Sequence, residues 1–268
     1  MKHILTAVVA AAVLLPVTSL ADTSITAAGS TALLPLVKAS AASYQTQHPD
    51  VKISVSGGGS FVGISQASQG NIDLGDSDVV APGGAGLMDH RVAVVGFGII
   101  VHPDAGVTNL SAKQIRDIFA GRIINWKDVG GKDQNIVVIN RPRSSGTRAV
   151  FSATIMGTSK INESGLVEDS SGTVVTTVGT TPGAVSYVAL GYTKNKPVTV
   201  LKINGVEANA ENIRTGKYPI WSYEHIFTKG RPKPEVDAFI RYIANNKEQI
   251  EELGFIQIST MKVSENGR

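Results

Sequence analysis

Three short loops of Gly, Ser and Thr each follow a β-prone run and precede a helical pattern. They are Gly29-Ser30-Thr31, Gly59-Ser60 and Ser144-Ser145-Gly146-Thr147. Such a loop offers unpaired N–H groups, hydroxyls and the positive end of a helix dipole, which bind a small anion without much net charge. For any one loop alone, ordinary helix capping by Ser or Thr is the stronger interpretation. Three of them beside an Arg and an Asp favour one site for a tetrahedral oxyanion.

The arginine is Arg141, which directly follows an apolar run and precedes the third loop. Its planar guanidinium can contact an oxyanion through two parallel hydrogen bonds. A solvated surface side chain is the alternative, and it fits Arg143 and Arg148 at least as well.

The aspartate is Asp78, which ends the segment Gly75-Asp76-Ser77-Asp78. An ionised carboxylate accepts hydrogen bonds but donates none, so it admits an anion that still carries a proton and repels one that has lost it. Near neutral pH phosphate keeps a proton and sulfate does not. The carboxylate therefore predicts selection of phosphate over sulfate. The alternative, which stays open, is that Asp78 only stabilises a turn.

Composition excludes several classes of protein. The chain has 268 residues with no Cys, which excludes disulfide scaffolds, thiolate metal sites, iron–sulfur clusters and Cys nucleophiles. A net charge of +3 with 6% aromatic residues does not indicate nucleic-acid binding. With 42% hydrophobic residues the chain is not disordered. Its 28 Gly predict loops in which the backbone comes close to a neighbouring group.

Motifs for catalysis and for metal binding are not matched. A dinucleotide or nucleophile-elbow pattern around Gly57 and Ser60 fails at Val62, and there is no Walker-type Gly-Lys-Ser/Thr sequence. The five His are scattered without an i,i+4 pair, and Asp73, Asp76 and Asp78 do not match a calcium loop. We therefore expect no catalytic residues, no metal and no cofactor.

The first 21 residues have the pattern of an export signal. A short basic start at Lys2 and His3 precedes an apolar run, and Ser19-Leu20-Ala21 is a small-x-small cleavage site. The run is shorter than the ~20 residues that span a bilayer, which disfavours the alternative of a membrane anchor. We expect cleavage near Ala21 and a periplasmic or secreted mature protein.

The rest of the chain alternates strand and helix patterns, which predicts an α/β fold with largely parallel sheets. Helices are expected from Thr31, over 61–68, after the capping box at Ser111, over 147–156, and over 234–245 and 247–253. Strands or β-prone runs are expected at 24–27, 51–55, 72–74, 92–101, 136–139, 174–178, 185–188 and 198–203.

These loops resemble those of a known family, the phosphate-binding component of bacterial high-affinity phosphate ABC transporters in its shorter form. The resemblance spans essentially the whole mature chain. Its motifs are Ala28-Gly29-Ser30-Thr31-Ala32-Leu33, Gly59-Ser60, Gly75 to Asp78, and Arg141-x-x-x-Ser145-Gly146-Thr147, of which the last is the most specific. Longer members carry an aromatic residue at the position of Ala32, which affects the wall of the cleft but not a backbone contact.

The resemblance implies the roles of individual residues. Hydroxyl or N–H donors to phosphate would be Ser30, Thr31, Ala32, Ser60, Ser145, Gly146 and Thr147, with Arg141 as the charge contact and Asp78 as the proton acceptor. Whether Ser30 donates through its hydroxyl or only shapes its loop stays open.

The resemblance also implies a two-lobed periplasmic-binding-protein fold of type II, with the ligand in the cleft between the lobes. Each lobe would be a mostly parallel sheet flanked by helices. Residues 22–100 with 196–268 would form lobe 1, and residues 101–195 lobe 2. The implied partners are inorganic phosphate and the permease and ATPase subunits of a phosphate importer, and we expect a monomer.

Three other functions stay open at the level of sequence. The first is a binding protein for sulfate or molybdate, which Asp78 disfavours. The second is a secreted phosphatase with Ser60 or Ser145 as nucleophile, which no positioned His supports. The third is a signalling or adhesion protein built on the same fold.

Overall fold

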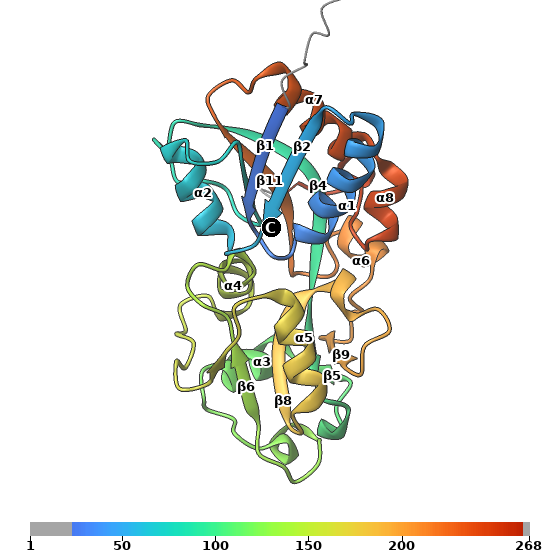
Figure 1. Ribbon diagram of the computed structural model, residues 1–268. Coiled ribbons are helices and arrows are strands. Elements are labelled where there is room, and N and C mark those ends of the chain that lie inside the picture. The colour runs from blue at the N-terminus through green and yellow to red at the C-terminus, as the bar shows by residue number, and fades with distance from the viewer. Residues whose placement is uncertain (1–22, 265–268) are drawn as a thin grey trace, which may run out of the picture.

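The computed structural model describes residues 23–264, and these form an α/β fold (Figure 1). The predicted signal segment, residues 1–21, lies outside the described residues. The helices are α1 (Leu34–Gln47), α2 (Ser60–Gln69), α3 (Ala112–Phe119), α4 (Gly146–Phe151), α5 (Ser171–Thr180), α6 (Ala210–Arg214), α7 (Pro234–Asn245) and α8 (Lys247–Glu252). The strands are β1 (Thr23–Gly29), β2 (Val51–Ser56), β3 (Leu74–Ser77), β4 (Leu87–Val101), β5 (Asn109–Leu110), β6 (Val137–Asn140), β7 (Leu166–Val167), β8 (Ala184–Ala189), β9 (Thr199–Val200), β10 (Lys202–Ile203) and β11 (Trp221–Lys229).

Most strands belong to one sheet with the order β2-β1-β3-β11-β4-β8-β6-β7, and β9 pairs with β4. The outer groups β2-β1-β3 and β8-β6-β7 are parallel, as predicted. The middle strands β11 and β4 are antiparallel to their neighbours. A small second sheet pairs β10 with β5.

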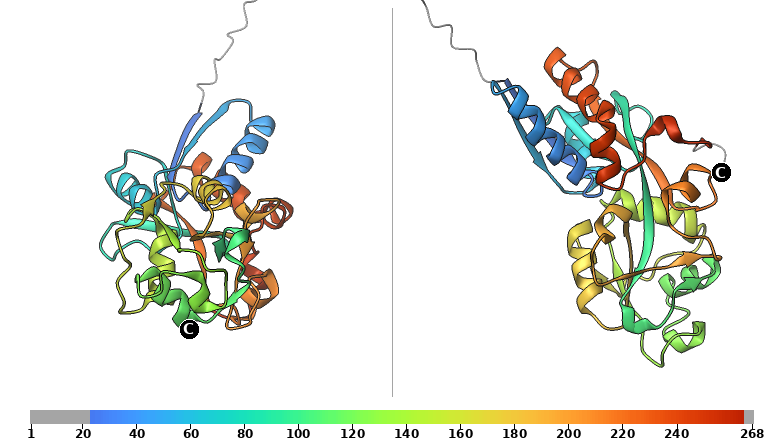
Figure 2. Two further views of the ribbon diagram at one scale, coloured as in Figure 1. Left: turned by 90° about the horizontal axis from the view of Figure 1, so that it is seen from below. Right: turned by 90° about the vertical axis from the view of Figure 1, so that its right-hand side faces the viewer.

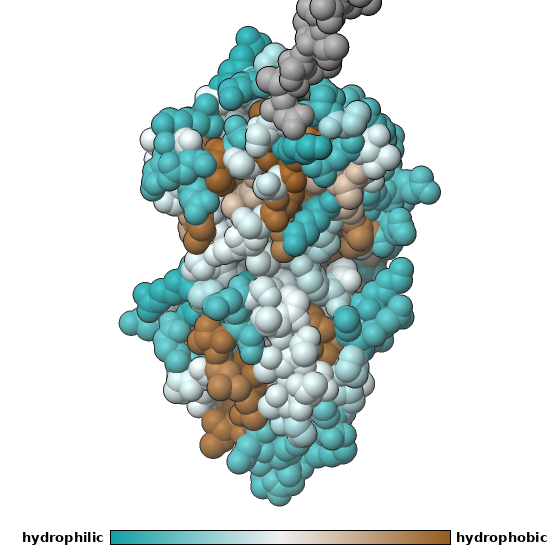
Figure 3. Space-filling model, in the orientation of Figure 1, coloured by the Kyte–Doolittle hydropathy of each residue, from teal (hydrophilic) through white to brown (hydrophobic). Residues whose placement is uncertain are grey.

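The long strand β4 connects two halves of the molecule (Figures 1 and 2). Its residues 87–96 pair with β11, and its residues 97–101 pair with β8. We call the part around β1, β2, β3, α1, α2, α7 and α8 the β1 half, and the part around β6, β7, β8, α3, α4 and α5 the β8 half. A waist separates the two halves on the surface, and the halves touch across it (Figure 3).

Helices of the β1 half bury apolar stripes against their neighbours. α1 has Pro35 in its first turn, where the missing N–H costs nothing, and it buries Leu36, Val37 and Tyr44. α7 buries Phe239 and Ile243 at helical spacing. The rings of Tyr44 and Phe239 lie 5.3 Å apart, so these two helices share one part of the core.

One predicted β-prone run is a helix. Residues 174–178 lie inside α5, where Val174, Val175 and Val178 are buried. The helix starts at a capping box of Ser170 and Thr173, and its buried valines pack against the sheet. Tertiary burial and the cap outweigh the strand preference of β-branched residues here.

Other differences are shifts or omissions. The strand expected at 72–74 is β3 at Leu74–Ser77, and the helix expected over 147–156 ends as a π-helical turn from Ser152. The sequence patterns gave no strand at Trp221–Lys229, although β11 lies in the centre of the sheet. No helix within residues 23–264 is long and apolar enough to cross a membrane.

Candidate functional site

The carboxyl group of Asp78 is the centre of a hydrogen-bond network at the waist. Its Oδ1 accepts the hydroxyl of Ser30, and its Oδ2 accepts the hydroxyl of Thr147 at 2.7 Å. The backbone N–H of Asp78 donates to Oγ of Ser60 at 2.9 Å. Because Ser30 and Ser60 belong to the β1 half and Thr147 to the β8 half, this network connects the two halves.

Arg141 is the cation of the site, and its exposed fraction is only 1%. One nitrogen, Nη2, donates to Oγ1 of Thr31 and to the carbonyl of Asp169, each at 3.1 Å. Its Nε and Nη1 are buried and have no hydrogen-bond partner within residues 23–264. Nor does Arg141 form an ion pair with Asp78 in that part of the chain. The guanidinium therefore presents two unpaired N–H-bearing atoms inside the protein.

Two glycines let the loops approach each other. Gly59 has φ +96°, and a Cβ there would lie 2.5 Å from the carbonyl oxygen of Ser144. A Cβ on Gly146 would lie 2.1 Å from Oγ of Ser60 and 3.0 Å from Cβ of Asp78. The backbones of these loops therefore lie close to neighbouring groups, as the number of glycines in the sequence predicted.

The other predicted site residues are also buried at the waist. Ser145 caps α4, because its Oγ accepts the N–H of Arg148 at 3.2 Å. The N–H of Ala32 donates to Oγ of Ser30 at 3.0 Å. The exposed fraction is at most 5% for Ser30, Thr31, Ala32, Ser60, Asp78, Arg141, Ser145 and Thr147, and Gly146 is buried as well. The structure therefore brings all nine predicted residues to one region.

Burial and charge perturb both ionisable groups of the site. Burial raises the pKa of the Asp78 carboxyl, while hydrogen bonds from Ser30 and Thr147 and the charge of Arg141 lower it. Burial lowers the pKa of the Arg141 guanidinium, and the negative charge of Asp78 opposes that shift. Asp78 and Arg141 therefore stabilise each other's charged form, although the two side chains form no ion pair.

Residues that were not predicted complete the site from the β8 half. The N–H of Ser171 donates to Oγ1 of Thr31 at 3.2 Å, and the hydroxyl of Tyr192 donates to the carbonyl of Thr31 at 2.7 Å. Ser171 stands at the start of α5, and the sequence Ser170-Ser171-Gly172 resembles the other three loops. That signal was available, but the strand expected at 174–178 concealed it. Tyr192 has no comparable signal.

Two further carboxyl groups lie beneath the site. Asp76 and Glu224 are fully buried, and burial raises the pKa of each well above its ordinary value. Neither was predicted as a site residue.

Openings flank the site on two sides. One, of about 460 Å³, is lined by Thr31, Leu34, Gly57, Gly58, Pro142, Ser144, Asp169 and Ser170. The other, of about 940 Å³, includes Asp78 together with Phe61, Val80 and residues of α4 and β11. Among residues 23–264 no group of three or more His, Cys, Asp or Glu could hold a metal ion.

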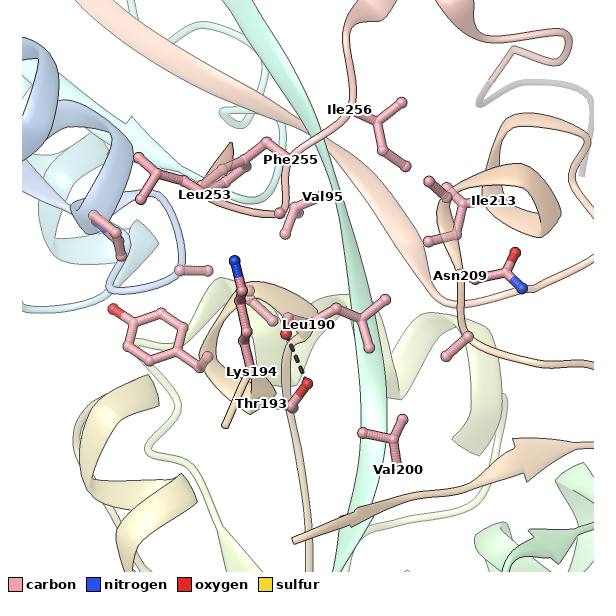
Figure 4. A pocket seen from close by; sticks show the side chains of 18 of the residues that line it. Val95, Leu190, Thr193, Lys194, Val200, Asn209, Ile213, Leu253, Phe255 and Ile256 are labelled. Carbon is pink, nitrogen blue, oxygen red and sulfur yellow. Dashed lines mark hydrogen bonds between the residues drawn. The ribbon is translucent and has the colours of Figure 1, made fainter. Parts of the chain in front are cut away.

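A separate cavity of about 750 Å³ lies at the junction of the halves (Figure 4). Its walls are mainly apolar and include Val95, Leu190, Ile213, Leu253 and Phe255, with the Lys194 side chain extending across it. Of the candidate-site residues described in this section, it shares only Ala32 and Tyr192. Its apolar lining does not suit a small anion.

Comparison with known proteins gives consistent results. The model of the PBP superfamily domain matches residues 16–247. The phosphate-binding protein PstS of Bacillus subtilis (strain 168) is 43% identical over 252 residues, which cover 91% of this chain and 84% of that protein.

Two solved structures share the fold predicted from the sequence. A putative phosphate ABC transporter substrate-binding protein with bound phosphate, from Clostridium perfringens, has a TM-score of 0.82 and 29% identity, covering 88% of this chain and 100% of the other. An ABC-type phosphate transport receptor from Vibrio cholerae has a TM-score of 0.71 and 30% identity, covering 87% and 99%. The predicted family and the α/β periplasmic-binding-protein fold are thereby confirmed: the chain belongs to the PBP superfamily and, within it, to the family of the PstS proteins.

Proposed function

We propose that this protein binds inorganic phosphate outside the cytoplasm and delivers it to an ABC importer, without chemical change to the ligand. The observation that carries the proposal is the buried pair of Arg141 and Asp78, which share one site and form no ion pair. A tetrahedral anion with one proton fits between them, because it can accept from the guanidinium and donate to the carboxylate.

Each predicted residue has a place in this proposal. The unpaired Nε and Nη1 of Arg141 would donate to two oxygens of phosphate. Hydroxyls of Ser30, Thr31, Ser60, Ser145 and Thr147, together with N–H groups of Ala32 and Gly146, would surround the remaining oxygens. The helices α1, α2, α4 and α5 begin at these loops, so their dipoles favour negative charge there.

We infer that the two halves are the lobes expected from the sequence, residues 22–100 with 196–268 and residues 101–195. The strand pairings support one adjustment to these boundaries. Residues 97–101 of β4 pair with β8, β9 pairs with this same end of β4, and β10 pairs with β5, so the chain would cross within β4 and again before β11. Phosphate would bridge the lobes and shift the population toward the closed form.

The relatives support the rest of the proposal. The Clostridium protein contains phosphate, and it and the Vibrio protein are described as components of phosphate ABC transport. By analogy, the closed form would dock on a membrane permease coupled to an ATPase. Export after cleavage near Ala21 and a monomeric state are part of the same proposal. The relatives are binding proteins, which favours binding over phosphatase activity.

Calorimetric titration of the mature protein with phosphate, arsenate and sulfate tests the proposal. We expect tight binding of phosphate, similar binding of arsenate, negligible binding of sulfate and no hydrolysis of a phosphomonoester. Absence of phosphate binding, sulfate binding as tight as that of phosphate, or turnover of the ester would contradict it.

A further inference from the structure

The register of two strands places Glu224 beside Asp78. In the antiparallel pair of β3 and β11, His225 lies opposite Ser77 and Ile226 lies opposite Asp76. Continued by one residue, this register places Glu224 opposite Asp78. Side chains two residues apart on a strand share a face, so those of Asp76 and Glu224 lie on one face of the sheet, and Asp78 is the first residue after β3.

The three carboxyl groups differ in their hydrogen-bond donors. All three are at most 1% exposed. Asp78 accepts the hydroxyls of Ser30 and Thr147, whereas no donor within residues 23–264 reaches either carboxyl oxygen of Glu224 or of Asp76. A buried carboxylate without donors is strongly disfavoured relative to the neutral acid.

A side-chain hydrogen bond between Glu224 and Asp78 raises the pKa of Glu224 and lowers that of Asp78. Two ionised carboxylates offer only acceptors, so this contact requires a proton between them. Asp78 is the better site for the negative charge, because two hydroxyls and the charge of Arg141 stabilise it there. Burial raises the pKa of Glu224 well above its ordinary value, and the charges of Asp78 and Asp76 raise it further.

We propose that Glu224 is protonated at neutral pH and donates a hydrogen bond to Asp78, and so holds Asp78 as the ionised acceptor for the proton of the bound anion. Glu224 is a positioning residue, since it acts through Asp78 and does not touch the ligand. The role given to Asp78 rests on the proposed function, whereas the proton on Glu224 does not.

Few other charged groups face Glu224. On β3 and after it these are Asp76 and Asp78, and from the β8 half the charge of Arg141 acts on Asp78. Tyr192 also interacts with Glu224, and its pKa is raised to about 12, so it stays neutral. The helix α2 packs on β11 and has no titratable side chain, and the partner of Glu224 on β4 is Ala93. Loss of the Glu224 proton would therefore place an uncompensated negative charge against Asp78.

Infrared spectroscopy of the mature protein at neutral pH tests the proton directly. A protonated carboxyl has a carbonyl-stretch band that a carboxylate lacks. We expect Glu224→Gln to remove one such band. Asp76→Asn is the matched control, because Asp76 is equally buried on the same face. In the Asp76→Asn background, Glu224→Gln is still expected to remove a band. If Glu224→Gln removes none, Glu224 is ionised and the proposal is wrong.

Phosphate titrations of two variants test the hydrogen bond to Asp78. The amide of Glu224→Gln can donate to Asp78, whereas Glu224→Leu cannot. We expect the Leu variant to bind phosphate about tenfold or more weakly than the Gln variant, with melting curves confirming that both are folded. Equal affinities of two folded variants would overturn the proposal.

A pH series distinguishes titration of Glu224 from a merely structural role. From about pH 8 to about pH 10 phosphate keeps one proton throughout, so the ligand itself does not change. In wild type, the phosphate affinity is expected to fall at the pH at which the Glu224 band disappears. The Gln variant is expected to show no such fall, and a fall in both proteins alike would overturn the proposal. If wild type binds no phosphate while the band still depends on Glu224, the proposed function fails and the proton assignment stands.

Discussion

Arg141 and Asp78 have opposite charges in one buried site, and the polar atoms around them form a partly satisfied network. Asp78 receives two hydroxyls, while two nitrogens of Arg141 have no partner in the described chain. A buried donor without an acceptor is costly, so these nitrogens favour an anion that supplies the acceptors. On the proposed function, a few side chains would carry the recognition of the anion, and the net charge of +3 need not reveal it.

Substitution of Arg141 should remove much of the affinity. We expect Arg141→Ala to weaken phosphate binding by ~2–4 kcal/mol, because Asp78 and the anion then lose their buried cation. Calorimetry measures this directly. Arg143→Ala is the matched control, since that side chain is 87% exposed, and its affinity should equal that of wild type. Unchanged affinity of Arg141→Ala would place Arg141 outside the site.

The buried Asp76 should make stability depend on pH. Burial and the nearby charge of Asp78 raise the pKa of Asp76. Its contribution to stability is therefore fully present below the unfolded-state value near pH 4 and is lost as pH rises through the folded-state pKa. We expect the melting temperature of Asp76→Asn, relative to wild type, to increase as pH rises.

Asp117 supplies the control with the opposite sign. Hydrogen bonds from Lys113 and Arg122 lower the pKa of Asp117. Its contribution is present above the unfolded-state value and is lost as pH falls. The melting temperature of Asp117→Asn, relative to wild type, should therefore decrease as pH rises. The same trend in both variants would contradict the assigned shifts.

At the scale of elements, four helices begin at the site, and the sequence identified three of those starts. The loops before α1, α2 and α4 could be predicted because helix capping and anion binding use the same local residues. The start of α5 was missed because the β-branched run after Ser171 favours a strand locally. Its helical state depends on packing against a sheet that is not encoded in that segment.

Glu224 and Tyr192 could not be predicted from local pattern. Glu224 reaches Asp78 only through the pairing of β11 with β3, whose residues are about 150 positions apart in the sequence. No strand was predicted at residues 221–229, and residues 221–228 are all buried. Long-range register and burial on both faces decide the roles of these residues.

The first turn of α4 gives a prediction about how the loops meet. Gly146→Ala places a Cβ against Ser60 and Asp78 from the opposite half. We expect at least about a tenfold loss of phosphate affinity, since the halves could not approach as closely. Gly172→Ala is the control, because its Cβ would lie 3.8 Å from the nearest atom, in the first turn of α5. Equal affinities of the two variants would show that close approach at Gly146 is unimportant.

At the scale of the whole molecule, both halves contribute residues to the candidate site. Ser30, Ser60 and Asp78 come from the β1 half, and Arg141 and Thr147 come from the β8 half. On the proposed function, the full set of ligand contacts would form only when the halves meet, while β4 runs continuously through both. On the proposed function, this arrangement would link ligand binding to closure of the waist.

Small-angle X-ray scattering should detect that closure. We expect the radius of gyration of the mature protein to decrease on addition of phosphate and to stay constant on addition of sulfate. Gly146→Ala should show a smaller decrease at saturating phosphate. A radius that does not respond to phosphate in wild type would mean that closure is independent of the ligand.

The most direct test of phosphate recognition is the affinity ratio of phosphate to sulfate, measured by calorimetry for wild type and Asp78→Asn side by side. An asparagine can donate as well as accept, so it removes the repulsion of an unprotonated anion. We predict that wild type prefers phosphate by at least about a hundredfold, the scale of one buried charge left without a partner. In Asp78→Asn the ratio should fall by about tenfold or more. Equal binding of the two anions by wild type, or an unchanged ratio in the variant, would contradict the account.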